Sequence, residues 1–211
     1  MKKKIGMVVV FAFLTASAFA LSVGGGLLFD YSANNGLETN IAGNDLYTGI
    51  RNTSFGGFVF FDATYVEADI SFAYGSLTLV TEMPGISSTD DFGSVLQLGF
   101  SILGKYPFHL GSVTLFPLLG FNLNAVVSGS DNEGNKFTDA GDLSQFSLQA
   151  GIGLDYHFTD SIFLRAEGLF QLRFASKYQD DMMTFLNKGG GGWDTTFGMG
   201  PVIKVAVGYK F

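Results

Sequence analysis

The sequence predicts an all-β protein: a closed, antiparallel, up-and-down barrel of eight strands that spans a membrane. Three observations lead to this fold. Apolar and polar residues alternate over eight segments, the links between the segments alternate between short and long, and 47% hydrophobic residues accompany only 15% charged ones. The 23 phenylalanines and 29 glycines occur without any helix-length apolar run after residue 21. Such a composition is typical of a chain that faces lipid with every second side chain.

The first twenty residues have the features of an export signal that is removed. Its parts are a positive n-region, an apolar h-region and an A-x-A cleavage site: Lys2 to Lys4, residues 5–14, and Ala18 with Ala20. The apolar stretch is too short to cross a bilayer as a helix, which takes about 20 residues. We therefore expect cleavage before Leu21, which leaves residues 21–211 as one barrel domain.

The charge balance and the absence of cysteine exclude several classes of function. Loss of the signal leaves nine basic residues against nineteen acidic ones, a net charge of about −10. Nucleic acid and anionic lipid would repel such a chain, so no nucleic-acid partner is expected. The chain contains no cysteine, which excludes a disulfide framework, cysteine-ligated metal and thiol catalysis.

The eight segments follow one another along the whole exported chain. Apolar residues occupy every second position in each, because side chains of a strand point to opposite faces in turn. The segments are residues 21–31, 55–65, 66–74, 96–105, 115–124, 146–158, 162–174 and 197–211. Pro117 and Pro201 fall inside two of them, where each removes a donor from the ladder, and we expect a bulge or bend at both.

The links between segments differ systematically in length. Short turns are expected at 64–65, 106–112 and 159–161, and long polar loops near 33–53, 76–92, 126–144 and 176–195. Membrane barrels have short turns on the periplasmic side and long loops outside the cell. This order predicts that both chain ends are periplasmic. Aromatic residues gather near the segment ends, as they do in interfacial girdles.

A soluble β-sandwich or lipocalin-like barrel is the alternative fold, with the apolar face turned inward. It would have to pack the Phe- and Leu-rich face of all eight segments into one interior, which is too much bulk. The glycine-rich polar face fits the narrow interior of an eight-stranded barrel better. Closure is expected because hydrocarbon cannot satisfy the hydrogen bonds of an open sheet edge.

The last residues carry a resemblance to a known family. Val205, Val207, Tyr209 and the terminal Phe211 alternate up to the carboxylate. This pattern resembles the C-terminal signal by which the outer-membrane assembly machinery recognises barrel proteins. The exported chain as a whole resembles the small outer-membrane barrels typified by OmpX, OmpW and the barrel of OmpA. Residues 60–65 and 103–108 are also similar to spirochaete outer-membrane barrel proteins of unassigned function.

The resemblance implies a location and partners but no activity. It implies the outer membrane of a diderm bacterium, with outer-membrane lipid and the barrel-assembly machinery as partners. Its members include adhesins, structural proteins, narrow pores and enzymes, so architecture does not decide function. No cofactor is implied, and the resemblance identifies no extracellular ligand for the loops.

The sequence offers little for catalysis. The enzymes of this family work with His and Ser at the outer-leaflet end, whereas His109 and His157 are both expected near the periplasmic end. The glycine run 189–192 lacks the Lys-Ser/Thr of a phosphate loop and is expected to be a flexible loop. No spacing of residues indicates a metal site.

Charged residues on the polar face are more informative. They are Asp62, Glu67, Asp69, Lys105, Asp155, Arg165, Glu167 and Lys204. Counting from the short turn at 159–161 sets Asp155 opposite Arg165, and a looser count sets Glu167 opposite Lys204. We expect an ion-pair network that fills the lumen, with an ion-lined narrow pore as the alternative.

Three functions remain open from the sequence. The first is a non-enzymatic, surface-exposed barrel with a structural or surface-interaction role. The second is a narrow channel for small or apolar solutes, and the third is a lipid-modifying enzyme.

Overall fold

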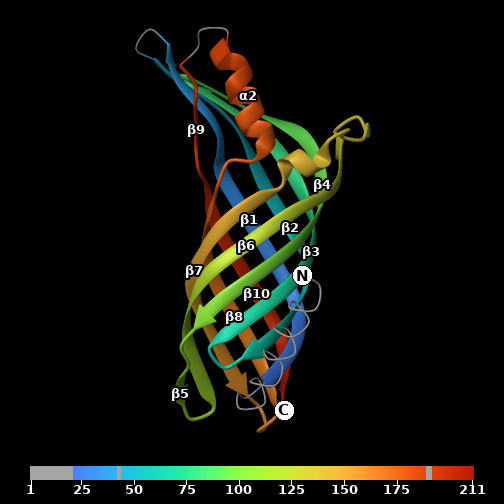
Figure 1. The fold of residues 1–211 in the computed structure, drawn as a ribbon, viewed down its shortest axis with the longest axis vertical. Helices are drawn as coiled ribbons and strands as arrows, with labels where there is room; N and C mark the ends of the chain where they lie inside the picture. Colours follow the sequence, from blue (N-terminus) through green and yellow to red (C-terminus); the bar gives the residue numbers. More distant parts are fainter. Residues whose placement is uncertain (1–20, 42–43, 189–191) are drawn as a thin grey trace, which may run out of the picture.

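The computed structural model describes residues 21–41, 44–188 and 192–211 (Figure 1). The expected export signal, including Lys2 to Lys4, Ala18 and Ala20, lies outside the described residues, as do residues 189–191 of the glycine run. The described part of the chain forms eight long strands: β1 (Leu21–Ile41), β2 (Asn44–Ala63), β3 (Val66–Met83), β4 (Ile86–Lys105), β6 (Val113–Asp131), β7 (Gln145–His157), β8 (Ile162–Arg173) and β10 (Gly198–Lys210).

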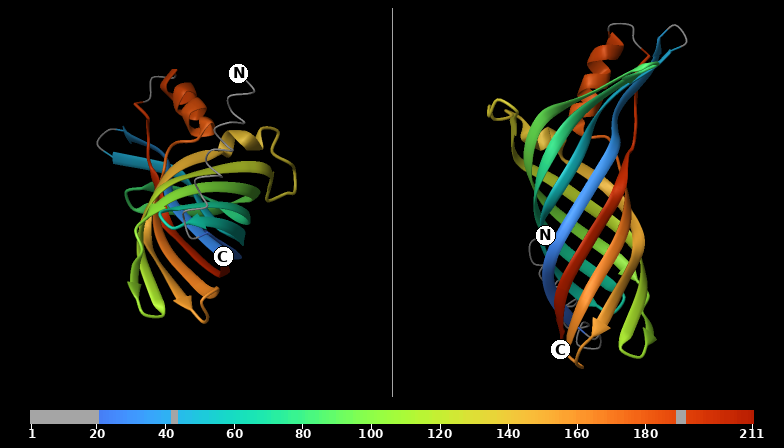
Figure 2. Two further views of the ribbon diagram at one scale, coloured as in Figure 1. Left: turned by 60° about the horizontal axis from the view of Figure 1, so that its bottom comes forward. Right: turned by 180° about the vertical axis from the view of Figure 1, so that it is seen from behind.

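The eight strands close into a ring. Each pairs antiparallel with its neighbours in the order in which they follow along the chain, and β10 returns to pair with β1 from Ser22↔Lys210 to Ala33↔Met199. The prediction of a closed, antiparallel, all-β barrel is therefore confirmed. Leu21 and Phe211 lie at the same end of the barrel, where the backbone N–H of Phe211 donates to the carbonyl of Leu21 at 2.9 Å (Figure 2).

The apolar face of the strands points outward. Phe61 is 63% exposed and Ile152 70% exposed, whereas Arg165 on the opposite face is fully buried. The same parity holds around the ring, so the soluble alternative with its apolar face inward is wrong. An exterior of this kind is stable only where lipid replaces water.

Aromatic side chains mark the two edges of the apolar band. At one edge, rings with centroids 5.6–5.8 Å apart run around the barrel: Phe121, Phe146, Phe174 and Phe197. At the edge near the short turns lie three further groups: Tyr65 with Tyr106 and Phe108, Tyr156 with Phe158, and Tyr209 with Phe211. Phe146 and Tyr156 are ten residues apart on β7, which gives a band about 25 Å high for a strand tilted by about 40°. This is the height of the apolar band of outer-membrane barrels.

Two of the four expected long loops are strands instead. β1 continues to Ile41 before β2 begins at Asn44, and β3 reaches Met83 before β4 begins at Ile86, so both pairs of strands form tall hairpins. Their upper parts lose the apolar alternation because no lipid faces them, while the backbone ladder continues. The sequence signal for the second hairpin was Pro84-Gly85: Gly85 has φ +79°, as a tight turn after proline requires.

The other two expected loops contain ordered elements. β6 continues to Asp131 and is followed by the short helix η2 (Ala140–Leu143). The last loop forms helix α2 (Lys177–Lys188) and the short strand β9 (Asp194–Thr195), which pairs with β1. Both helices lie at the end of the barrel opposite the short turns (Figures 1 and 2). In the described part of the chain, no helix is long and apolar enough to cross a bilayer.

The short links lie where expected, but the two prolines do not cause bulges. The link at 106–112 contains a small strand, β5 (Phe108–Leu110), paired with β6. Pro117 and Pro201 pair in continuous register with Ile152 and Phe170, so of the expected bulge or bend the bulge is wrong. Each proline instead lies where the ladder on its other side is interrupted, which makes its missing N–H harmless.

The apolar exterior predicts how the purified protein behaves. We expect recovery only in detergent or membrane fractions, and a folded form that migrates differently from the boiled form on gels. The reason is that lipid-facing side chains such as Phe61 and Ile152 would otherwise be exposed to water. A monodisperse, water-soluble protein without detergent would contradict the membrane assignment.

Candidate functional site

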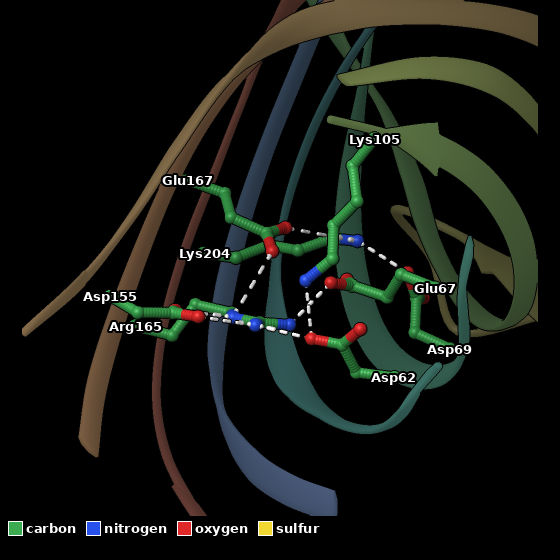
Figure 3. Close-up of polar contacts among 8 residues, drawn as sticks. All are labelled: Asp62, Glu67, Asp69, Lys105, Asp155, Arg165, Glu167 and Lys204. Atoms are coloured by element: carbon green, nitrogen blue, oxygen red, sulfur yellow. Dashed lines mark hydrogen bonds and ion pairs between the residues drawn. The ribbon is translucent and has the colours of Figure 1, made fainter. Parts of the chain in front are cut away.

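Eight charged residues lie together inside the half of the barrel nearest the short turns (Figure 3). They come from six strands: Asp62 (β2), Glu67 and Asp69 (β3), Lys105 (β4), Asp155 (β7), Arg165 and Glu167 (β8), and Lys204 (β10). Their side chains are at most 8% exposed. These are the eight residues that the sequence analysis placed on the polar face, and we call them the lumen network.

Arg165 is the centre of the lumen network. Its Nε and Nη2 donate to the two oxygens of Asp155 at 2.7 and 2.6 Å, directly across the β7–β8 ladder. Nη2 also donates to Asp62 at 2.6 Å, and Nη1 donates to Glu67. Paired charge-assisted bonds of this kind hold a guanidinium in one orientation. One side chain therefore ties β8 to β2, β3 and β7.

Three buried aromatic rings surround the guanidinium of Arg165. Its central carbon lies 4.4 Å from the ring centroid of Phe60, 5.1 Å from that of Phe116 and 5.2 Å from that of Phe163. Glycines make room for these rings: a Cβ on Gly24, Gly153 or Gly208 would collide with Phe60, Phe116 or Phe163, respectively. The three rings fill the lumen around Arg165. Because ring faces attract a cation, they also stabilise the charge of the guanidinium.

The two lysines join further strands. Lys204 of β10 donates to Asp69 of β3 at 2.6 Å and lies 3.8 Å from Glu167, its partner in the β8–β10 ladder. Lys105 of β4 pairs with Asp62 of β2, with its Nζ 4.4 Å from the ring centroid of Phe116. Each base is thus paired with a carboxylate from another strand.

Charge in the lumen network is not balanced. Five carboxylates face three bases, which leaves a formal charge of −2 if all groups are ionised. Both oxygens of Glu167 and one oxygen each of Asp62, Glu67 and Asp69 accept no hydrogen bond from any residue that the structure describes. Loss of a base should therefore cost much more stability than loss of Glu167.

A second buried polar cluster lies higher in the lumen and was not singled out from the sequence. Asp30 of β1 accepts hydrogen bonds from Gln171 and Arg173 of β8. The alternation of side chains along each strand places all three residues on the inward face. Their contact, however, forms only because β10 pairs with both β1 and β8 and so closes the ring. Opposite charges at similar heights on strands next to the closure were the signal that could have revealed it.

The space between and above these clusters is small. A void of about 20 Å³ lies between the lumen network and Asp30, and another of about 40 Å³ lies below α2. A single water needs about 10–15 Å³ by this kind of measure, so each void has room for only one to a few waters. Above them, Gln179 of α2 accepts from Gln145 at 3.3 Å and from the backbone N–H of Ser176 at 2.9 Å, which holds the helix over the opening.

The mouth at the short-turn end is wider. An open cavity of about 570 Å³ is lined by both histidines and by Lys210, which points toward this mouth rather than into the lumen network. The hydroxyl of Thr114 lies 3.0 Å from Nδ1 of His109 and 3.3 Å from Nε2 of His157. In residues 21–41, 44–188 and 192–211, no group of three or more His, Cys, Asp or Glu is arranged to hold a metal ion.

The residues of the C-terminal pattern lie on β10 and just after it. Val205, Val207 and Tyr209 point outward and are 46–57% exposed, and Phe211 is 77% exposed beside the ring of Tyr209. The pattern is therefore accessible on the outer surface at the short-turn end.

No protein-family model matches the chain, and no curated protein matches it. Among solved structures, the chain is similar to the outer membrane protein OprG from Pseudomonas aeruginosa, with 13% identity and a TM-score of 0.49 over 92% of this chain and 96% of that one. It is also similar to the translocator domain of the autotransporter NalP from Neisseria meningitidis, with 12% identity and a TM-score of 0.27 over 99% of this chain and 98% of that one.

Proposed function

We propose that the protein is a non-enzymatic barrel of the outer membrane of a diderm bacterium, with a structural or surface-interaction role. An apolar band about 25 Å high, bounded by aromatic girdles, suits that membrane. Barrels of the outer membrane have their short turns in the periplasm and their longer loops outside the cell. Both chain ends then lie in the periplasm, and the tall hairpins, η2 and α2 extend outside the cell.

Closure of the lumen is the observation that favours this role over a channel. Arg165 and its partners join opposite walls of the barrel, and three rings fill the space around them. The Asp30 cluster and α2 add two further barriers on the outer side. A barrel of eight strands has room for side chains inside but not for an aqueous channel.

Planar-bilayer recordings test the closed lumen. We expect the purified protein to insert without producing steady conductance steps, while a sixteen-stranded porin does so in the same membranes. Reproducible ion-conducting steps from the wild-type protein would contradict the proposal and support the narrow channel. For apolar solutes, uptake into vesicles with and without the protein makes the same distinction.

A lipid-modifying enzyme is the remaining alternative, and no feature of the described residues at the outer end favours it. His109 and His157 line the mouth at the short-turn end, away from the outer leaflet in the proposed orientation. A mass spectrum of lipid A from cells with and without the gene should show no difference. A mass shift that depends on the gene would overturn the non-enzymatic role.

The terminal pattern supports recognition by the barrel-assembly machinery. Replacing Phe211 with Lys should lower the amount of folded protein in the outer membrane and leave unfolded protein in the periplasm. Phe158→Lys is the matched control, because Phe158 is also an exposed aromatic residue at the short-turn end but is not terminal. Cell fractionation and gel migration measure the outcome, and equal effects of the two substitutions would contradict a terminal signal.

A further inference from the structure

The outer end of the barrel holds a cavity that plays no part in closing the lumen. It has a volume of about 280 Å³ and is lined by seven residues from β4, the link before β7, and α2: Phe92, Phe137, Thr138, Asp139, Asp142, Leu143 and Tyr178. Three of these are aromatic and two are carboxylates. We call it the outer cavity.

The aromatic walls of the outer cavity are held in place from behind. The rings of Phe92 and Phe137 stack with centroids 5.7 Å apart, and both pack against the buried apolar cluster of Leu77, Val95 and Val126. The backbone N–H of Phe137 donates to the carbonyl of Gly129 at 2.9 Å. A Cβ on Gly129 would collide with the ring of Phe137, so glycine lets that ring lie against β6. The walls therefore exist before any ligand arrives.

One carboxylate of the outer cavity, Asp142, already binds an ammonium group. Nζ of Lys177 lies 2.8 Å from Asp142 and 3.6 Å from Asp181, just outside the lining residues. The hydrogen bond and the charge of Asp142 raise the pKa of Lys177. Asp139 precedes η2 but its side chain makes no capping hydrogen bond to that helix, so its charge is not used in this way.

Charge around the outer cavity also favours cations. The four links at this end, residues 33–53, 76–92, 126–144 and 176–195, contain twelve acidic and four basic residues. Surface charge of one sign raises the local concentration of oppositely charged small molecules. Anions and phosphate-bearing ligands are disfavoured for the same reason.

We propose that the outer cavity binds a small organic cation of the quaternary-ammonium class. Aromatic faces bind such cations because the charge is spread over apolar methyl groups that need no hydrogen-bond acceptor. Asp139 supplies the counter-charge at the rim, because Asp142 is already paired with Lys177, and Leu143 adds an apolar contact. A soluble cation and the choline headgroup of a lipid present the same group; the acidic surroundings favour the soluble cation, because a headgroup also carries a phosphate.

Calorimetric titration in a maltoside detergent, which carries no ammonium group, tests the proposal on the folded barrel. Choline should bind saturably at one site. The neutral isostere 3,3-dimethylbutanol should bind at least about tenfold more weakly, because it has the same shape without the charge. Glycerophosphocholine should bind more weakly than choline if the ligand is a soluble cation, and as well as choline if the ligand is a lipid headgroup.

Substitutions locate the binding site. Phe137→Leu or Tyr178→Leu should weaken choline binding by about threefold to thirtyfold, because each removes one ring face but keeps an apolar side chain. Asp139→Asn should weaken it and reduce its dependence on salt. Phe185→Leu and Asp90→Asn are the matched controls, since neither residue lines the outer cavity, and both should leave the affinity unchanged.

Several results would overturn the proposal. They are the absence of choline binding to the wild-type protein, equal affinity for choline and the neutral isostere, and an equal loss of affinity in the control variants. A gel shift on heating shows that each variant is folded. The titration is made in detergent, so its result does not depend on the orientation of the barrel or on whether the lumen conducts.

Discussion

Replacing Arg165 with alanine should destabilise the barrel by about 3–5 kcal/mol, because the substitution leaves buried carboxylates without their partner. The guanidinium is fully buried and donates to Asp155, Asp62 and Glu67 from three other strands. Its removal leaves five carboxylates facing only Lys105 and Lys204. The three rings around Arg165 would also border a cavity, which adds to the cost.

Urea unfolding of the barrel in lipid vesicles measures this effect, with Glu167→Gln as the control from the same network. Glu167 is equally buried, but neither of its oxygens accepts a hydrogen bond from the described residues, so its replacement should cost far less. Adding Asp155→Ala to Arg165→Ala should recover part of the loss, since one orphaned carboxylate disappears. If Arg165→Ala costs no more than Glu167→Gln, the lumen network does not stabilise the barrel.

The direction of each side chain, outward or inward, could be predicted from the sequence, because only one arrangement of the strands keeps Phe and Leu in lipid. Once Phe61 and Ile152 point outward, the period of two sends Asp62 and Asp155 inward. Counting from the short turn at 159–161 set Asp155 opposite Arg165, and this is the register of the β7–β8 ladder. The turn leaves no freedom of register, which is why the count succeeded.

Other features could not be read from the alternation of residues. Above the membrane the outward face of a strand meets water, while the inward face carries buried apolar residues such as Leu77 and Val80. The upper parts of β1 to β4 therefore lack the pattern of apolar residues outside and polar residues inside, and looked like loops. Phe116 and Phe163 are inward residues that do not follow the polar pattern; they fit only because Gly153 and Gly208 leave space for their rings. That match of ring and glycine across strands depends on register, not on local sequence.

The position of α2 over the opening could not be predicted from the sequence either. Its buried contact is Gln179, which bonds to Gln145 at the start of β7 and to Ser176. A polar contact of this kind has no periodic signature in the sequence, and neither does the pairing of Asp30 with Arg173 across the closure of the ring. The pair of Asp30 and Arg173 forms only when β10 closes the barrel between β1 and β8.

The second large effect is the loss of stability when an arginine replaces a lipid-facing residue, and its size depends on the depth of that residue in the membrane. Ile152 lies midway along β7 between the girdle residues Phe146 and Tyr156 and is 70% exposed on the outer surface. Ile152→Arg therefore places a charge near the middle of the apolar band, and we expect a loss of about 2–4 kcal/mol in the free energy of unfolding. The long side chain cannot reach either interface without moving the strand.

Two further isoleucines make a matched series, because each receives the same substitution at a different depth. Ile162 is 44% exposed beside the short turn, and Ile86 is 60% exposed at the tip of the β3–β4 hairpin. Ile162→Arg should cost no more than about 1 kcal/mol, since charges near the interface are tolerated. Ile86→Arg should have almost no effect, because its side chain already lies in water. Unfolding midpoints of the three variants in vesicles give the comparison, and equal losses at all three positions would show that the band between the two aromatic girdles is not the part of the barrel that lies in lipid.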